Sequence, residues 1–207
     1  MNPGEWWQFG NEPNDSNQDN ISPAEYARRY YAFSAALKQA DPLARVVPAG
    51  VANADWQWTN SFRESYRAEY GTYPRVDGWN VHNYLLDRCQ DALDVNAFQA
   101  RILAFRDWMA GIGEMAKPLF LTEYGVLYGN GCCNCPSIPP DQVIGYMRTT
   151  SQWLSKTNLV QAWSWFALRT DGRFNGDLFS ARDELTEYGL AFRDLIKQGS
   201  DRPGPNP

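Results

Sequence analysis

The strongest constraint on the fold is an alternation of short apolar runs with longer stretches of helical spacing, repeated along the 207 residues. Short apolar and aromatic runs are typical of strands, whereas apolar residues three and four positions apart are typical of amphipathic helices. This alternation predicts an α/β protein with parallel strands, because each helix returns the chain to the start of the next strand. The predicted strands lie at about residues 6–10, 45–49, 76–82, 119–123 and 160–168, and the helices at about 22–41, 55–70, 95–115, 141–156 and 186–197.

The first predicted helix has well-marked ends. Ser22 is a suitable N-cap, Pro23 occupies the first helical position, and Glu25 completes a capping box. Asp41 precedes a proline, which disfavours helical backbone and predicts the end of the helix.

Composition excludes several classes of protein. The net charge is −5 and charged residues make up 21% of the chain, so we expect no nucleic-acid partner, since a phosphate binder needs a basic surface. No apolar run is long enough to cross a bilayer, and we expect no membrane partner. No signal peptide is visible at the start of the chain. Residues 1–198 are predicted to form one domain, and the Pro/Gly-rich stretch 199–207 a disordered tail.

Five strands do not close a barrel, since eight parallel strands usually need roughly 250 residues. A doubly wound sheet is complete with fewer strands, but that fold predicts a glycine-rich phosphate loop after the first strand. Here the first strand is followed by Asn11, Glu12 and Pro13. The choice of fold therefore depends on the chemistry of the strand ends.

The carboxyl ends of the predicted strands carry a coherent set of functional side chains. In a parallel barrel such ends meet at one face, where active sites lie. Two glutamates in this position could serve as the two carboxyl groups of a retaining glycosidase, and neighbouring aromatic and amide groups could bind sugar. Individually, a glutamate can be a solvated cap, a histidine a satisfied core residue and a tryptophan a core residue. The set consists of Asn11, Glu12, His82, Tyr84, Glu123, Trp163 and Trp165.

Four motifs together resemble clan A glycoside hydrolases. The run Trp6–Asn14 resembles the fourth-strand signature of that clan, and Leu119–Gly125 is similar to its seventh-strand motif. Val81–Tyr84 resembles the sixth-strand motif, and Ala162–Phe166 the eighth strand with its tryptophan platform. The segment Leu185–Phe192 is similar to the entry of the final helix. The motifs occur in the order of the clan, and the resemblance spans about residues 5–195.

The resemblance implies a partial TIM (β/α)8 barrel with five βα units that correspond to strands 4–8. It implies retaining hydrolysis of β-glycosidic bonds in a glycan or oligosaccharide, with Glu12 as general acid/base, Glu123 as nucleophile, and Tyr84 in contact with the nucleophile. Carbohydrate is the expected substrate, with no metal and no organic cofactor. The substrate-binding residues implied are Asn11, His82, Tyr84, Trp163 and Trp165.

The same resemblance implies that the first three βα units are lacking, together with an arginine that the clan places beside the nucleophile. Five strands of an eight-stranded barrel leave open edges, which favour pairing between chains. We therefore expect a poorly stable chain or self-association through these edges.

The cysteines lie in two of the predicted loops. Cys89 follows the third strand, and Cys132, Cys133 and Cys135 follow the fourth. A disulfide from Cys89 to one of the other three is reasonable, because adjacent loops share one face of a barrel; sequence alone does not choose the partner. Disulfides suit an extracellular or cell-envelope enzyme, whereas a zinc cluster and reduced thiols are the alternatives.

The sequence is also compatible with two competing functions. One is a non-catalytic carbohydrate-binding fragment that keeps the strand ends and the tryptophan platform without an organised carboxylate pair. The other is a metal- or partner-binding domain built around the cysteine loop. A phosphate-handling enzyme is more distant, because no glycine-rich phosphate cradle is present.

Overall fold

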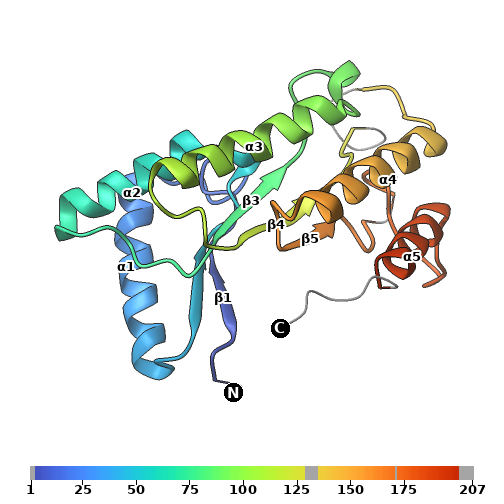
Figure 1. Cartoon of the computed structure of the whole chain (residues 1–207). Coiled ribbons are helices and arrows are strands. Elements are labelled where there is room, and N and C mark those ends of the chain that lie inside the picture. Colours follow the sequence, from blue (N-terminus) through green and yellow to red (C-terminus); the bar gives the residue numbers. More distant parts are fainter. Residues whose placement is uncertain (1–2, 129–134, 171, 201–207) are drawn as a thin grey trace. The chain divides into compact units, whose positions relative to one another are not determined.

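The computed structural model describes residues 3–128, 135–170 and 172–200. Strands and helices alternate in the predicted order, with two short 3-10 turns, η1 (Ala52–Ala54) and η2 (Cys89–Asp91) (Figure 1). The α/β class is thereby confirmed. The strands are β1 (Trp6–Phe9), β2 (Arg45–Pro48), β3 (Trp79–Asn83), β4 (Leu119–Tyr124) and β5 (Ala162–Trp165). The helices are α1 (Pro23–Ala40), α2 (Trp56–Tyr70), α3 (Val95–Gly111), α4 (Pro140–Thr157) and α5 (Glu187–Ser200).

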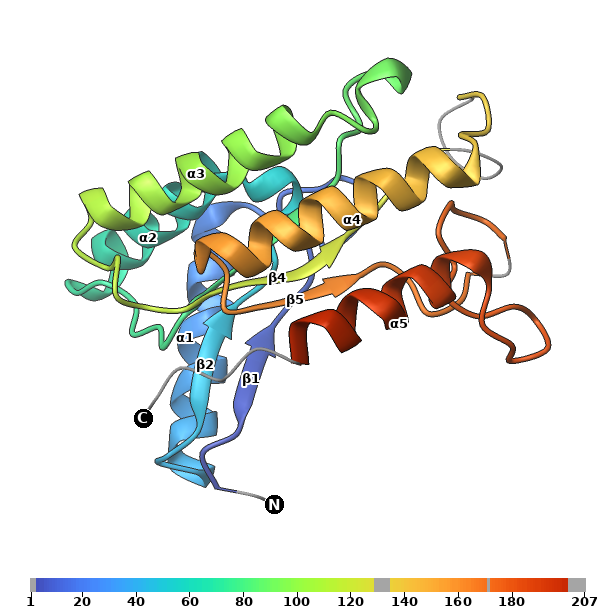
Figure 2. The same cartoon turned by 45° about the vertical axis from the view of Figure 1, so that its right-hand side comes forward.

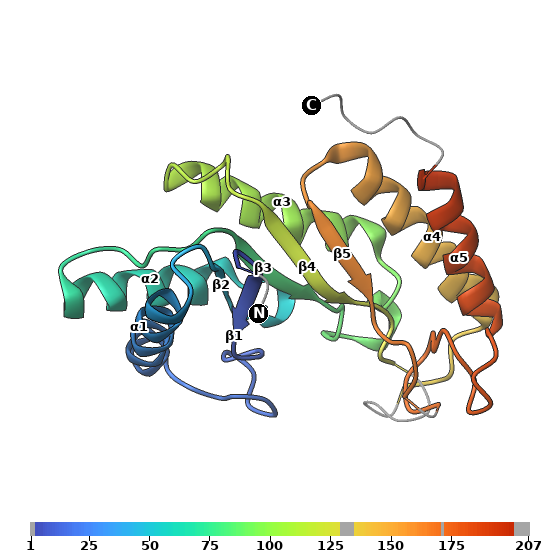
Figure 3. The same cartoon turned by 90° about the horizontal axis from the view of Figure 1, so that it is seen from below.

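Strand order follows chain order, as expected for consecutive βα units. β1 and β2 form a parallel pair in which Trp6 lies opposite Arg45 and Phe9 opposite Pro48. β3, β4 and β5 form a three-stranded sheet in that order (Figure 3). A parallel bridge joins Val51, just beyond β2, to Val81 in β3.

The chain divides into two compact units, and the first comprises Met1–Asn83, Arg101–Thr122 and Val160–Trp163. Its core includes an aromatic cluster between α1 and α2, in which the ring of Tyr26 lies 4.9 Å and that of Tyr30 5.4 Å from the ring of Phe62. Phe9 of β1 stacks on Phe33 of α1 at 4.7 Å. All three residues at the centre of the cluster, Tyr26, Tyr30 and Phe62, are fully buried.

The second unit comprises Tyr84–Ala100, Glu123–Leu159 and Ser164–Pro207. Within it α4 and α5 pack against each other (Figure 2). Tyr124 at the end of β4 is buried, and its hydroxyl group lies 2.8 Å from that of Ser151 in α4. Burial raises the pKa of Tyr124 to about 12, so this phenol stays neutral in the core.

Helix boundaries follow the predicted capping chemistry in the first helix. The Ser22 hydroxyl accepts a hydrogen bond from the Glu25 amide, and Pro23 begins α1. α3, in contrast, ends at Gly111 instead of the predicted 115. Gly113 has a φ of +77°, a left-handed conformation that glycine adopts without strain and that ends the helix.

Two strands are shorter than predicted because other groups take their hydrogen bonds. β3 begins at Trp79 and not at 76: the Asp77 amide donates to the Val46 carbonyl, but the Val46 amide donates to the Asp77 carboxylate and not to a backbone carbonyl. β5 ends at Trp165 and not at 168, since Ala167 and Leu168 accept hydrogen bonds from the backbone of residues 178 and 179.

Several predictions about organisation stay predictions. α5 continues through Ser200, into the stretch predicted as tail, and residues 201–207 lie outside the described residues. The single domain over 1–198 and self-association are likewise untested. β1 is an edge of its two-stranded sheet, and 38% of Trp6 and 38% of Trp7 are exposed there. Because such an edge can pair with a second chain, light scattering, which measures the oligomeric state, tests self-association.

Candidate active site

Glu12 lies just beyond β1 in an unusual backbone conformation. Its φ is +42°, a left-handed value that is uncommon for a residue with a side chain and is often found at functional sites. Its amide donates a hydrogen bond of 3.1 Å to the carbonyl of Gly50, just beyond β2. The side chain is buried, with 8% of the residue exposed. The turn therefore directs a carboxyl group inward at the end of the strand.

Tyr26 of α1 holds the ends of β1 and β2 together beneath this turn. Its hydroxyl donates to the Phe9 carbonyl at 2.7 Å and accepts from the Ala49 amide at 2.7 Å. Burial raises the pKa of Tyr26 above its usual range, because no charged form is tolerated in the core. The Tyr26 hydroxyl thus joins the ends of β1 and β2 and fixes the segments that carry Glu12 and Gly50.

His82 in β3 contacts Glu12 directly. Its Nδ1 lies 2.8 Å from Oε1 of Glu12, and its Nε2 lies 3.0 Å from the hydroxyl oxygen of Thr122 in β4. Only 1% of the residue is exposed. Gly50 makes room for the ring, since a Cβ at that position would lie 2.3 Å from the imidazole. His82 is therefore both a core histidine and a partner of the predicted acid/base.

A chain of polar groups continues from Thr122. Its hydroxyl donates to Oδ1 of Asn80 at 2.9 Å, and Nδ2 of Asn80 donates to Oε1 of Gln8 at 2.6 Å. Nε2 of Gln8 donates to the Gly10 carbonyl at 3.1 Å. The sequence motifs did not mark these residues as part of the site. Two signals were available: Asn80 has the same strand parity as His82, and Thr122 is a polar residue within an apolar strand.

Glu123, the next residue of β4, is held by Tyr84. The Tyr84 hydroxyl donates to Oε2 of Glu123 at 2.8 Å, which is the contact that the sequence predicted. Tyr84 is 5% exposed, and its ring meets that of Phe166 edge-on at 6.0 Å between centroids. The Tyr84 hydroxyl therefore orients the Glu123 carboxyl group at the end of β4.

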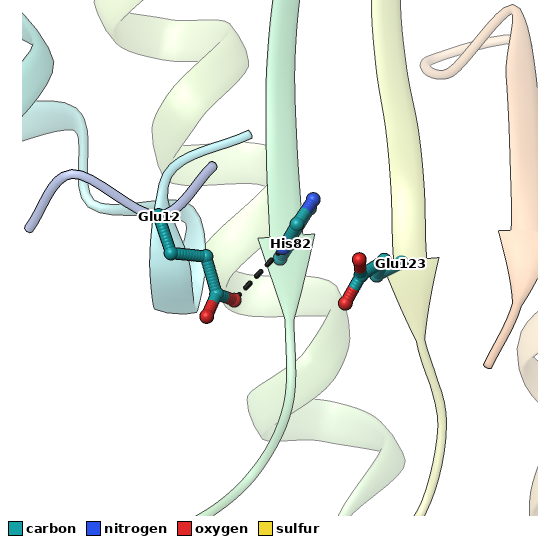
Figure 4. Close-up of side chains that lie close together, drawn as sticks. All are labelled: Glu12, His82 and Glu123. Atoms are coloured by element: carbon teal, nitrogen blue, oxygen red, sulfur yellow. Dashed lines mark hydrogen bonds and ion pairs between the residues drawn. The ribbon is translucent and has the colours of Figure 1, made fainter. Parts of the chain in front are cut away.

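Glu12, His82 and Glu123 form one group of side chains (Figure 4). One side-chain ligand atom from each residue lies within 4.8 Å of those of the other two. Two carboxylates and an imidazole are also groups that divalent cations accept. Each ring nitrogen of His82, however, is engaged by Glu12 or by Thr122, and a cation would have to displace one of them. The absence of a metal stays a prediction.

The other predicted sugar-binding residues differ in exposure. Asn11 is half-buried, and its side-chain amide donates to Gln18 at 3.3 Å. Trp163 is also half-buried. Trp165 is 5% exposed, packs 5.3 Å from the Tyr124 ring and donates its indole N–H to the Gly176 carbonyl at 2.9 Å. A sugar-binding role stays a prediction for all of them, and the burial of Trp165 favours core packing.

The cysteine prediction has a definite outcome for one pair. Cys89 and Cys135 form a disulfide, with their Cα atoms 5.6 Å apart. These two sulfur atoms are therefore not thiolate ligands for zinc in this structure. Cys132 and Cys133 lie outside the described residues.

Glycoside hydrolases on βα folds carry a pair of carboxyl groups at the carboxyl ends of different strands, and the fold with Glu12 and Glu123 is typical of this class of enzyme. The sequence model of the family described as glycosyl hydrolase catalytic core matches residues 8–192, and the chain belongs to that family. No curated protein sequence matches the chain. No helix in the described part of the chain has the length and apolar character to cross a membrane.

Solved structures share the fold at low sequence identity. A GH128 (subgroup I) endo-β-1,3-glucanase from Amycolatopsis mediterranei, in complex with laminaritriose, is 21% identical with a TM-score of 0.67, over 92% of this chain and 72% of that one. A GH128 (subgroup II) endo-β-1,3-glucanase from Sorangium cellulosum is 20% identical with a TM-score of 0.64, over 91% and 68%. A glucosidase from Croceicoccus marinus is 17% identical with a TM-score of 0.73, over 93% and 40%. The fold is thus that of part of a (β/α)8 barrel.

Proposed function

We propose that this glycoside hydrolase cleaves β-1,3-linked glucan with retention of configuration, with Glu12 as general acid/base and Glu123 as nucleophile. The observation that carries the proposal is the grouping of Glu12, His82 and Glu123, whose ligand atoms lie within 4.8 Å of one another. Retaining enzymes hold their carboxyl groups about 5–5.5 Å apart, whereas inverting enzymes need about 6.5–9.5 Å to admit a water molecule. The short separation supports retention.

The surroundings of the two carboxyl groups support the division of roles. Glu12 shares a hydrogen bond with an imidazole nitrogen, which can exchange a proton with it, as an acid/base requires. Glu123 accepts a hydrogen bond from the Tyr84 phenol, which orients the carboxyl group for attack, as a nucleophile requires. In the first step Glu123 attacks the anomeric carbon while Glu12 protonates the leaving oxygen. In the second, Glu12 removes a proton from the water that releases the sugar.

The substrate class rests on the neighbouring structures. Two of those described above are endo-β-1,3-glucanases, and one of them holds laminaritriose. β-1,3-Glucan is therefore the first substrate to test on this chain, ahead of xylan, mannan or a small β-glucoside.

The test is hydrolysis of laminari-oligosaccharides, with the first-formed anomer followed by proton NMR. We expect the β-anomer to appear first, and both Glu123→Gln and Glu12→Gln to lower turnover of these oligosaccharides by about 10²-fold or more. Glu69→Gln is the matched control, because Glu69 is an exposed glutamate on α2. First formation of the α-anomer would reject retention. Binding of the oligosaccharide without turnover by the unaltered chain would instead support a non-catalytic carbohydrate-binding fragment.

We also infer that the protein works in an oxidising compartment, outside the cell or in the cell envelope. The support is the Cys89–Cys135 disulfide, since such bonds persist mainly in exported proteins. Mass analysis with and without reductant, on protein isolated without added oxidant, tests this. A gain of two hydrogens for this pair on reduction is expected, and fully reduced thiols at isolation would contradict it.

A further inference from the structure

The polar chain that leads to His82 has a fixed direction. Its outer end is the Gly10 backbone carbonyl, which can only accept a hydrogen bond, so the Gln8 amide must turn its NH₂ group toward Gly10. Gln8 then presents its oxygen to Asn80, and Asn80 must donate to it. The opposite orientation of both amides would place the Gln8 oxygen against the Gly10 carbonyl at 3.1 Å, two acceptors with no proton between them.

This direction reaches Thr122. Because Asn80 directs its NH₂ group toward Gln8, its oxygen faces Thr122, and the single hydroxyl proton of Thr122 is donated to it. The same hydroxyl oxygen lies 3.0 Å from Nε2 of His82 and can only accept there. Nε2 of His82 must therefore carry a proton.

The consequence appears at the other ring nitrogen. With Nε2 protonated, a neutral His82 has a bare Nδ1, which can face Glu12 only if the carboxyl group is protonated. If His82 is instead cationic, Nδ1 carries the proton and faces a carboxylate. In both cases one proton lies in the 2.8 Å bond between Nδ1 and Oε1 of Glu12. The hydrogen-bond network through Thr122 thus rules out one arrangement, in which a Glu12 carboxylate faces a neutral His82 that carries its proton on Nδ1.

We propose that Gln8, Asn80 and Thr122 are positioning residues that keep His82 protonated at Nε2, so that the pair of Glu12 and His82 enters the reaction with one proton to give. This proposal rests on the proposed function of Glu12 as acid/base. When the glycosidic C–O bond breaks, this proton passes to the leaving oxygen, and the Glu12 carboxylate then faces the bare Nδ1. Because these two acceptors face each other without a proton between them, the arrangement is unfavourable. Uptake of a proton from water by Glu12 in the second step relieves it. The pair then holds its proton again.

Two titratable side chains, Glu12 and Glu123, are grouped with His82 in the described part of the chain. Glu12 is the partner of Nδ1, and Glu123 accepts a hydrogen bond from the Tyr84 phenol.

NMR reads the proton positions without any need for turnover. His82 is the single histidine of the chain, so ¹⁵N-histidine labelling gives one imidazole spectrum. Long-range proton–nitrogen correlation should show a protonated Nε2 across the pH range in which the protein is folded. Thr122→Ser keeps the hydroxyl and should preserve this pattern, whereas Thr122→Val should admit the Nδ1–H form. A bare Nε2 with a protonated Nδ1 in the unaltered protein would overturn the proposal.

Kinetics then test the effect on acid catalysis. Acid assistance matters for a sugar leaving group and hardly for dinitrophenolate, which departs without a proton. Thr122→Val should lower kcat/KM on laminari-oligosaccharides by about 10–100-fold and shift the basic limb of its pH profile to lower pH. For a dinitrophenyl β-glycoside, kcat/KM should fall by less than about threefold in Thr122→Val. Thr122→Ser should keep kcat/KM and the pH profile of the unaltered protein.

Equal losses on the two substrates would indicate a structural role and contradict the proposal, as would unaltered kinetics in Thr122→Val. An unaltered chain that hydrolyses neither substrate would reject the proposed function. The NMR result would still decide where His82 holds its proton.

Discussion

The surroundings of Glu12 and of Glu123 differ in a way that matches two chemical tasks. Glu12 lies on a strained turn, is buried, and bonds to an imidazole that other side chains orient. Glu123 lies within the regular strand β4, is half-buried, and accepts a phenol hydrogen bond. A partner that can exchange a proton suits an acid/base, whereas a neutral phenol donor suits a group that stays ionised.

The difference shows how one fold separates two identical side chains. The elements that hold Glu12 are the ends of β1 and β2, with Tyr26 and Gly50 between them. The element that holds Glu123 is the strand itself, with Tyr84 from the segment after β3. Each task can therefore be disturbed separately.

The largest expected effects come from the two carboxyl groups, and they should differ with the leaving group. Glu123→Gln should lower kcat/KM by about 10³-fold or more on every substrate, because no nucleophile remains. Glu12→Gln should cost about 10²–10⁴-fold on oligosaccharides but little in the first step with a dinitrophenyl glycoside. Stopped-flow release of dinitrophenolate measures this step. The same loss for both variants on both substrates would remove the distinction between the roles.

A smaller effect is expected from Gly50→Ala, which disturbs the Glu12 side alone. The added Cβ would lie 2.3 Å from the His82 ring and must displace it. We expect roughly 10²-fold lower activity on oligosaccharides, as for loss of acid assistance, with about 1–3 kcal/mol lower stability from overpacking.

Gly145→Ala in α4 is the control for Gly50→Ala, because in the described part of the chain no atom outside the neighbouring helix backbone lies within 4 Å of its added Cβ. It should leave activity unchanged and raise stability by about 0.5–1 kcal/mol. Urea unfolding and steady-state kinetics measure both variants. Full activity in Gly50→Ala would show that the position of His82 is unimportant.

Tyr84→Phe tests the Glu123 side more gently. It removes the hydroxyl that donates to Oε2 and keeps the ring against Phe166, so the loss should be about 10-fold in kcat. The loss should be similar for oligosaccharide and dinitrophenyl substrates, since the nucleophile serves both. A loss confined to oligosaccharides would place Tyr84 in the acid half of the mechanism.

The smallest effect on chemistry is expected from the disulfide. Replacement of Cys89 and Cys135 together by serine opens a loop that the disulfide closes across a sequence separation of 46, which should lower stability by about 2–4 kcal/mol in urea unfolding. Activity of the folded protein should stay within about twofold, because neither cysteine supplies a group to the proposed reaction. A large loss of kcat in the folded double variant would link the disulfide to the site.

Much of this arrangement follows from sequence pattern. The βα alternation gave the order of elements, and strand ends marked Glu12, His82, Tyr84 and Glu123, because parallel strands bring their carboxyl ends to one face. The Ser22 cap and Pro23 fixed the start of α1 through purely local chemistry.

The rest depends on register and packing between distant segments. Thr122 contacts Asn80 and His82 only because β3 and β4 pair in a particular register, which no local pattern specifies. Gly50 reveals its role only when the His82 ring is placed against it. Trp165 shares strand parity with Trp163, yet the loop at Gly176 covers it.

The most direct test of the account is to trap the glycosyl-enzyme. A 2-deoxy-2-fluoro β-glucosyl or laminaribiosyl fluoride slows release of the sugar, and peptide mass spectrometry then locates the attached group. The account predicts one sugar on the peptide that contains Glu123, bonded to that side chain, and none in Glu123→Gln. A sugar on another residue, or turnover with inversion and no trapped intermediate, would contradict it.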